Sequence, residues 1–436
     1  MLHHAKPPIS GRMTAAAVVS LALFLSLPAF AEARFRERPA AKKSRRVKPQ
    51  PITIGHQLLR LEERLGASDA DRRALDGLIE RATAVVPDAA RRGRRTARRA
   101  LQSIEIALRE SGFRDGSSSL LHRAMRDRRA DCDTRTILYL SIAEALRLPL
   151  VAARVEGAVP GHVIIRWRLA EGRFLDWETL TGSEFVPSNA HLRNLNRDEV
   201  VGLHHFNLGI EWARRGELVL ASDSLGESLA RDDTVAVVHA TRAEVLLRTF
   251  VQSELRQSAA LEQAFASVHR AVQMDPRDSN AHVLRSIVQY YRGRRGESMK
   301  DIRTAVRLDR QNPAARYYLG LALFKRGQTV RAIREFSRTI ALGSRSGNPF
   351  GERLVLSARL QRGLAYERRR GQDGGRPTAR NLVRAIRDAS ICLAAQPDNR
   401  EVKDLLSRLS LQRASLPNRP RAGADALQAA IHASRD

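Results

Sequence analysis

Cysteine is scarce in this sequence, which contains only Cys132 and Cys392 among 436 residues. Two cysteines do not make a disulfide framework, and these two fall in different predicted domains, so each is interpreted as a lone thiol. Aromatic residues are also few, at 5% of the chain. Cores that must be filled mainly by Leu, Ala, Val and Ile favour helices over a β-sandwich.

Lysine is rare as well, because only seven of the 75 Lys and Arg residues are lysine. The formal net charge of +28 would suit nucleic acid, but such a skew toward arginine is also what a GC-rich genome produces. The sequence has no sustained alternation of basic and aromatic residues of the kind that stacks bases. We therefore favour a general arginine-rich surface over a nucleic-acid site, while attraction to an anionic partner (acidic lipid, cell-wall polymer or nucleic acid) stays open.

The N-terminus has the three parts of a secretory signal peptide. Lys6 and Arg12 precede a short apolar run that ends in the small residues Ala29 and Ala31. This pattern predicts a signal peptide over residues 1–31, cleaved after Ala31, and a periplasmic or secreted protein. The alternative is a retained N-terminal membrane anchor, since the run is close to the length that spans a bilayer.

The rest of the chain divides by composition into four parts. Residues 32–54 are rich in Arg and Lys without an apolar pattern, which predicts a basic linker, and contact of this linker with an anionic surface is an alternative. Residues 55–190 are predicted to form a first folded domain and residues 198–412 a helical repeat array. Residues 413–436 are predicted to form a loose polar tail.

The first domain is predicted to begin with helices over residues 56–129, because apolar residues recur there at helical spacing. The clearest stripe belongs to a segment that ends near Glu110 and consists of Ala97, Leu101, Ile104 and Leu108. Six arginines fall on the other faces of the same segment and are interpreted as a solvated surface.

A buried helix and a hairpin follow. The helix is expected to be capped by Asp133 or Thr134 and to run to about Leu146. Strands are expected to begin at His162, after a Pro-Gly turn, and near Phe174. The domain therefore places one buried helix before an antiparallel sheet.

Three residues in this block suit thiol chemistry. Cys132 stands at the helix start, where unpaired N–H groups and the helix dipole favour a thiolate. A nearby imidazole can take the thiol proton, and a carboxylate can fix the tautomer of that imidazole. His162 and Asp176 have even numbers on neighbouring strands, so they share a sheet face and lie opposite each other if the turn centres on Leu169. Gly172 favours a slightly later turn, which would separate them along the strands.

The phrase VPGHVIIRW…FLDWETLTG and the order Cys132, His162, Asp176 resemble the transglutaminase-like cysteine proteins of bacteria. The resemblance covers about residues 115–187. It implies an α+β, papain-like thiol domain with Cys132, His162 and Asp176 as a catalytic triad, in the subgroup in which this domain precedes helical repeats. The triplet around Cys132 is also similar to that of periplasmic thiol proteinases that cleave surface adhesins.

One feature departs from the family pattern. Many members carry Gly shortly before the cysteine, whereas this chain has Ala130 and Asp131. An acidic neighbour opposes ionisation of the thiol. We expect no cofactor and no metal, because four clustered ligands are not visible and Cys392 lies 260 residues from Cys132.

The second half of the chain has an internal period of 34 residues, as shown by Gly293 and Gly327. Within units, a second pattern recurs: Gly209, Gly216, Ala221 and Leu225 match Gly320, Gly327, Ala332 and Phe336. This arrangement resembles the tetratricopeptide repeat and predicts an all-α solenoid of about five units between His204 and Leu409. Cys392, in the last unit, is interpreted as a buried small hydrophobe.

The leading functional hypothesis combines the two halves. An exported thiol hydrolase or peptidase would attack amide bonds through Cys132, with His162 as base and acid and Asp176 as the orienting group. Transfer to an amine, as in a transglutaminase, is left open beside hydrolysis. The repeats would recruit a protein or peptide on their concave face. The alternative is a catalytically silent scaffold that uses the repeats for protein–protein interaction.

Overall fold

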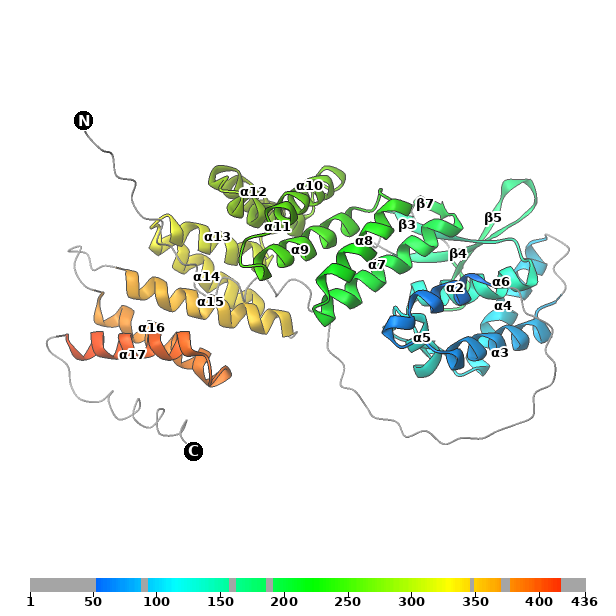
Figure 1. The fold of residues 1–436 in the computed structure, drawn as a ribbon, viewed down its shortest axis with the longest axis horizontal. Coiled ribbons are helices and arrows are strands. Elements are labelled where there is room, and N and C mark those ends of the chain that lie inside the picture. The colour runs from blue at the N-terminus through cyan, green and yellow to red at the C-terminus, as the bar shows by residue number, and fades with distance from the viewer. Residues whose placement is uncertain are drawn as a thin grey trace. The chain divides into compact units, whose positions relative to one another are not determined.

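The computed structural model describes residues 52–87, 93–156, 162–185, 191–345, 349–369 and 377–416. These residues form two compact units that divide between Arg242 and Ala243, inside helix α9 (Ala236–Gln252). The first unit combines helices with a sheet, and the described residues of the second are helical (Figure 1). The predicted signal peptide and most of the predicted linker and tail lie outside the described residues.

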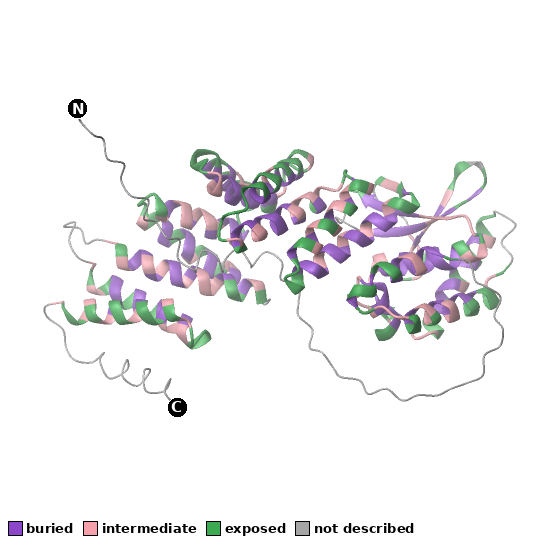
Figure 2. Ribbon diagram, viewed as in Figure 1, coloured by how far each residue is buried: buried purple, intermediate pink, exposed green. Residues whose placement is uncertain are grey.

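The first unit begins with a layer of helices: α2 (Ile54–Leu61), η1 (Glu63–Leu65), α3 (Asp69–Val85), α4 (Arg94–Glu110), α5 (Leu121–Asp127) and α6 (Cys132–Leu146). The predicted stripe of α4 is confirmed, since all four of its apolar residues are fully buried. They join one core with the other helices and with the inner face of the sheet. Figure 2 shows how buried positions run along these helices while other sides stay exposed.

Helix α6 is the central helix of this layer, and every residue from Thr134 to Ala143 is buried. Its N-cap is Asp131, whose side chain accepts a hydrogen bond of 2.9 Å from the Thr134 N–H. The prediction that Asp133 or Thr134 caps this helix is therefore wrong by two or three residues. The correction has a physical reason: an N-cap side chain bonds an N–H about three residues later, and Asp131 reaches one. Cys132 consequently becomes the first helical residue.

The sheet has five antiparallel strands in the order β6-β5-β4-β3-β7. Their bounds are β3 (Leu150–Glu156), β4 (Val163–Arg168), β5 (Phe174–Glu178), β6 (Ser183–Glu184) and β7 (His191–Leu195). Trp167 and Trp177 pack toward the helices, and a small cluster that includes Ile164 forms on the other face. A separate parallel pair joins β1 (Arg114–Asp115) and β2 (Arg129–Ala130).

The turn between β4 and β5 is centred later in the chain than Leu169. Arg166 pairs with Asp176 and Arg168 with Phe174, so the hairpin centres on residue 171, within η2 (Ala170–Gly172). Gly172 has a φ of 72°, a conformation that glycine adopts without steric cost. The shift of two residues decides which carboxylate faces His162.

Two further helices follow in the first unit before the start of α9. They are α7 (Arg197–Arg215) and α8 (Leu218–Arg231). They are joined by Gly216 at a φ of 83°. A Cβ added at Gly209 would lie 2.7 Å from the Leu225 side chain, so this glycine lets the two helices approach closely. The predicted start of the repeat array at residue 198 falls at the start of α7, although the compact units divide later.

The second unit continues as consecutive helices: α10 (Ser258–Met274), α11 (Ser279–Tyr291), α12 (Arg295–Leu308), α13 (Pro313–Lys325), α14 (Thr329–Gly343), α15 (Pro349–Arg368), α16 (Ala379–Ala395) and α17 (Arg400–Ala414). Gly293 and Gly327 both have positive φ at the helix turns, and Gly320 packs on Phe336 as Gly209 packs on Leu225. The prediction of a tetratricopeptide-type helical solenoid is thus confirmed. Within the described residues, no helix has both the length and the apolar character to cross a membrane.

Candidate functional site

Cys132 lies half-buried at the first position of α6, beside the start of β4. Its sulfur has two polar neighbours. The backbone N–H of Val163 donates a hydrogen bond to it, and the thiol donates to Asp133 Oδ1 at 3.6 Å. The fold therefore brings the Cys132 sulfur to the strand residue that directly follows His162.

The imidazole of His162 is paired with Glu178. Its Nε2 atom lies 2.6 Å from Glu178 Oε2, while Oε1 of the same carboxylate accepts the Leu180 N–H at 3.1 Å. The hydrogen bond that the ring donates to Glu178 raises the pKa of His162 against the opposing effect of burial. Burial alone would raise the pKa of Glu178, but the contact with His162 and the backbone N–H groups of Leu180 and Thr179 together outweigh it and lower that pKa. The pair thus favours a charged imidazolium beside a carboxylate.

Asp176 does not contact His162, so its predicted role as the orienting carboxylate needs a correction. Its Oδ1 accepts a hydrogen bond of 2.6 Å from Arg166 Nε, and that guanidinium stacks on Phe174 at 4.1 Å. The reason is the register: Arg166 stands directly opposite Asp176, and the same register extended outward places His162 opposite Leu180. Glu178 is on the same face as Asp176 and is nearer to the imidazole.

The electrostatics around Cys132 favour the protonated thiol. Burial, followed by the charges of Asp133 and Asp131, raises the pKa of the Cys132 thiol to about 12, against the Val163 N–H, which lowers it. Burial and the Asp131 charge also raise the pKa of Asp133 to about 6. The sequence correctly predicted the effect of an acidic neighbour. The helix start alone does not produce a thiolate here.

Asn207 of α7 is a further member of the site, and no sequence pattern pointed to it. Its Nδ2 atom lies 3.3 Å from Asp133 Oδ2 and 3.4 Å from the Ser119 carbonyl oxygen. A side chain 74 residues away along the chain therefore holds the carboxylate that accepts the hydrogen bond from the thiol. Only tertiary packing could bring these groups together.

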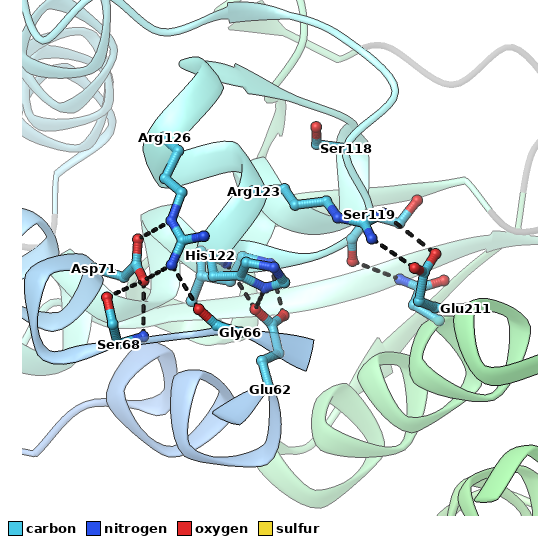
Figure 3. Close-up of polar contacts among 12 residues, drawn as sticks. Glu62, Gly66, Ser68, Asp71, Ser118, Ser119, His122, Arg123, Arg126 and Glu211 are labelled. Carbon is cyan, nitrogen blue, oxygen red and sulfur yellow. Dashed lines mark hydrogen bonds and ion pairs between the residues drawn. The ribbon is translucent and has the colours of Figure 1, made fainter. Parts of the chain in front are cut away.

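A buried polar cluster fixes α7 against the helical layer (Figure 3). Glu62 is fully buried and accepts the N–H groups of Leu121 and His122 at 2.7 Å each, and His122 Nδ1 lies 2.6 Å from its Oε2. His204 of α7 places its Nε2 3.0 Å from Glu62 Oε1, without hydrogen-bond geometry, so this contact is electrostatic. Burial would raise the pKa of Glu62, but the two histidines outweigh it and lower the pKa to about 2.

A second link joins the same elements. Arg123 of α5 donates to both carboxylate oxygens of Glu211 of α7, at 3.2 and 2.5 Å (Figure 3). Such two-pronged ion pairs hold geometry better than single contacts. Together with Glu62, this pair positions α7, and therefore Asn207, beside Asp133. Among the described residues, no group of three or more His, Cys, Asp or Glu side chains is arranged to hold a metal.

The second unit presents a different kind of candidate surface, in which arginines stack on aromatic rings. The guanidinium carbon lies near the ring centre in three pairs along the array, which we call the arginine–aromatic pairs: Arg292 with Phe265 at 3.8 Å, Arg368 with Phe324 at 5.6 Å and Arg384 with Tyr366 at 5.8 Å. Phe265 and Phe324 are only half-buried. Cys392 is 3% exposed, which confirms its interpretation as a packed residue.

No protein-family model matches the chain, and no curated protein is similar to it at a significant level. Several solved structures match part of the chain at low scores, among them proteins described as tetratricopeptide-repeat proteins. They include MamA (16% identity, 45% of this chain and 94% of that one, TM-score 0.34) and YrrB, described as having an unusual peptide-binding site (16%, 49% and 92%, 0.31). A repeat protein of Thermus thermophilus matches at 13% identity, over 48% and 99% of the chains, with a TM-score of 0.36. These scores are too low to support an inference about function.

Proposed function

We propose that this chain is a protein-binding adaptor in which the helical array of the second unit holds a segment of another protein. The observation that carries this proposal is the series of arginine–aromatic pairs along the array. Arginine and aromatic side chains are enriched in protein interfaces and supply most of their energetic hot spots. Stacked helical repeats also provide the extended surfaces on which such segments lie.

Selection from a phage library of random 16-residue peptides on the full chain tests this proposal. We expect enriched sequences whose synthetic peptides bind about tenfold more weakly to R292Q/R368Q. This variant removes two stacked guanidiniums, together with the ion pair of Arg292 and Glu262, and leaves the rings. The matched control R270Q/R277Q removes two exposed arginines of the same unit that do not stack on rings. Failure of any sequence to enrich, or equal weakening by both variants, would remove the basis for the adaptor.

A second candidate function is thiol chemistry at Cys132, because the structure places the sulfur at β4 and supplies His162 with a carboxylate partner. Within the resemblance to transglutaminase-like proteins, Cys132 would be the nucleophile, His162 the base and acid, and Glu178 the orienting group. The Cys132 sulfur, its proton passed to His162, would bond to an amide carbon, and the amine would leave with that proton. Water would then cleave the thioester, releasing a carboxylic acid and restoring the thiol.

The electrostatics rank this candidate second. With a thiol pKa near 12, only a small fraction of Cys132 is thiolate at neutral pH. Alkylation by iodoacetamide at pH 7.5, read by peptide mass spectrometry, separates the two functions, and Cys392 serves as an internal reference because burial also raises its thiol pKa to about 12. Labelling of Cys132 much faster than Cys392, lost in H162A, would favour the enzyme. Equally slow labelling of the two cysteines would leave the adaptor as the one supported function of the two.

Export of the chain is also a proposal, supported by the signal-peptide pattern of residues 1–31, which lie outside the described residues. N-terminal sequencing of the protein from the native cell is the direct test. A mature chain that begins at Glu32 would support cleavage after Ala31. An intact N-terminus in the membrane fraction would favour an anchor, and one in the cytoplasm would contradict export.

A further inference from the structure

Successive helix pairs of the second unit each bury one carboxylate against cations. Asp301 accepts from Arg285 at 2.6 and 2.9 Å, and Glu335 accepts from Arg316 and Arg338 at 2.9 and 2.6 Å. In both cases no more than two cationic groups meet the carboxylate, counting His282 beside Asp301. This arrangement neutralises a buried charge between paired helices.

The helix pair α15 and α16 has more cationic groups around its buried carboxylate. Asp388, 2% exposed, is held by the fork of Arg362 at 2.7 and 2.8 Å and is also reached by Arg359 at 3.3 Å. A cavity of about 430 Å³ opens beside it, and its lining adds Arg384 and Arg387. Four guanidiniums against one carboxylate leave a formal charge of +3 in this arginine pocket, which we define by Arg359, Arg362, Arg384, Arg387, Asp388 and Tyr366.

The positive charges of Arg384 and Arg387 are not neutralised by a carboxylate of the described residues. Both are exposed, and within the described residues neither is in an ion pair with a carboxylate; Arg384 instead lies over the ring of Tyr366. The Asp388 carboxylate accepts from Arg362 and Arg359, and its contacts with these two arginines already neutralise it. A guanidinium fork matches the geometry of a carboxylate.

We propose that the arginine pocket binds the carboxylates of an acidic peptide segment, with Arg384 and Arg387 as the contacting groups. The volume falls in the range of pockets that hold small ligands, which suits one or two acidic side chains. The net positive charge of the pocket attracts an anion, and under the proposed function the bound segment supplies that anion as acidic side chains. The proposal rests on the proposed function, because it names the chemistry of the segment that the array holds.

Fluorescence anisotropy with the full chain tests it, using a fluorescein-labelled hexaglutamate peptide with an amidated C-terminus and a hexaglutamine peptide of the same length. At 150 mM salt, where surface attraction is strongly screened, we expect binding of hexaglutamate but not of hexaglutamine. We expect R384Q/R387Q to weaken hexaglutamate binding about tenfold, since two charge-assisted contacts are lost. Arg362 is left in place, so Asp388 keeps its partner.

The matched control is R334Q/R353Q, which removes two exposed arginines from α14 and α15 and changes the net charge equally. The proposal predicts a change of less than twofold there. Equal weakening by both variants would show general electrostatic attraction and overturn the pocket. Tighter binding of a single-stranded oligonucleotide than of hexaglutamate, lost in R384Q/R387Q, would overturn the acidic peptide as its ligand.

The peptide selection distinguishes this inference from the function on which it rests. Enriched peptides without acidic residues, whose binding is unchanged in R384Q/R387Q, would overturn the arginine pocket and leave the adaptor intact. Acidic peptides that enrich on the wild-type chain and fail on R384Q/R387Q would support both.

Discussion

The Nε2 atom of His162 and the Oε2 atom of Glu178 lie 2.6 Å apart, and this contact sets the charge of the candidate thiol site. The carboxylate favours the imidazolium, whereas Asp133 and Asp131 disfavour the thiolate of Cys132. Both effects thus oppose the transfer of a proton from Cys132 to His162, and the acidic groups unbalance the site against the thiolate. A substrate or partner that neutralises Asp133 would remove part of this imbalance.

The Glu178 contact predicts that E178Q lowers the pKa of His162, because glutamine keeps the shape and loses the charge that holds the proton. The raised pKa means that the stability gained from the charged pair is fully present below the unfolded pKa of about 6.5 and is lost as the pH rises through the folded pKa. NMR titration of the His162 ring measures the change. D176N is the control, and an equal shift there would contradict the assignment.

Removing the charge of Asp133 should make Cys132 more reactive. Of the two acidic groups that raise the thiol pKa, Asp133 has the larger effect, and D133N removes its charge. The thiolate fraction should increase about tenfold for each unit by which the thiol pKa falls. The rate of iodoacetamide labelling at pH 8 reports this, with Cys392 in the same chain as reference. An unchanged ratio of the two rates would mean that burial alone controls the thiol.

The buried Glu62 cluster predicts a large loss of stability in E62Q. Removing one partner from a buried charge network lowers the free energy of unfolding by about 3 kcal/mol. The control E63Q changes the exposed neighbour Glu63 and should lower it by less than about 0.5 kcal/mol. All three tryptophans lie in the first unit, so their fluorescence during urea unfolding reports this unit alone. Similar losses in both variants would contradict the network.

The Glu62 cluster also predicts a pH dependence. Because the folded pKa is about 2, below the ordinary 4.5, the contribution of Glu62 to stability is present above pH 4.5 and is lost as the pH falls through 2. The difference in unfolding free energy between wild type and E62Q should therefore shrink as the pH falls from 5 to 2.5. A difference that stays constant over that range would show that the stabilisation does not depend on ionisation.

Glu244 should weaken the second unit at alkaline pH. Burial raises its pKa to about 8, and its Oε1 has no hydrogen-bond partner. The unfolded chain loses this proton above pH 4.5, so the contribution of Glu244 to stability falls from pH 4.5 up to the folded pKa. We expect E244Q to gain about 2 kcal/mol at pH 8 and almost nothing at pH 4.5. Thermal unfolding followed by circular dichroism measures this, with exposed E262Q as the variant that should not gain.

The close approach at Gly320 tests the repeat packing. An added Cβ would lie 2.7 Å from the Phe336 ring, so G320A should destabilise the second unit by about 2 kcal/mol. Gly296 of α12 has open space at the same position, and G296A should be neutral or gain up to about 1 kcal/mol from helix propensity. Circular dichroism melts compare the two. Equal effects would mean that the helices can separate to make room.

The helical elements were largely predictable because their signals are periodic. The stripe of α4 and the turn glycines Gly293 and Gly327 depend on spacings that a sequence shows directly. The candidate site was predictable only in part. Gly172 indicated a hairpin centre later than Leu169 but not by how much, and with the observed shift of two residues Glu178, rather than Asp176, contacts His162. A turn of three residues leaves few local constraints on its own position.

The sequence by itself determined the order of the elements, the 34-residue period and the lone thiol at a helix start, since each depends on residues close together along the chain. The tertiary structure decided which groups meet that thiol. Three contacts between separate elements do this: Asn207 with Asp133, the Val163 N–H with the sulfur, and Glu178 with His162. Their effect on ionisation depends on burial and on distances of a few ångströms, which local patterns do not specify.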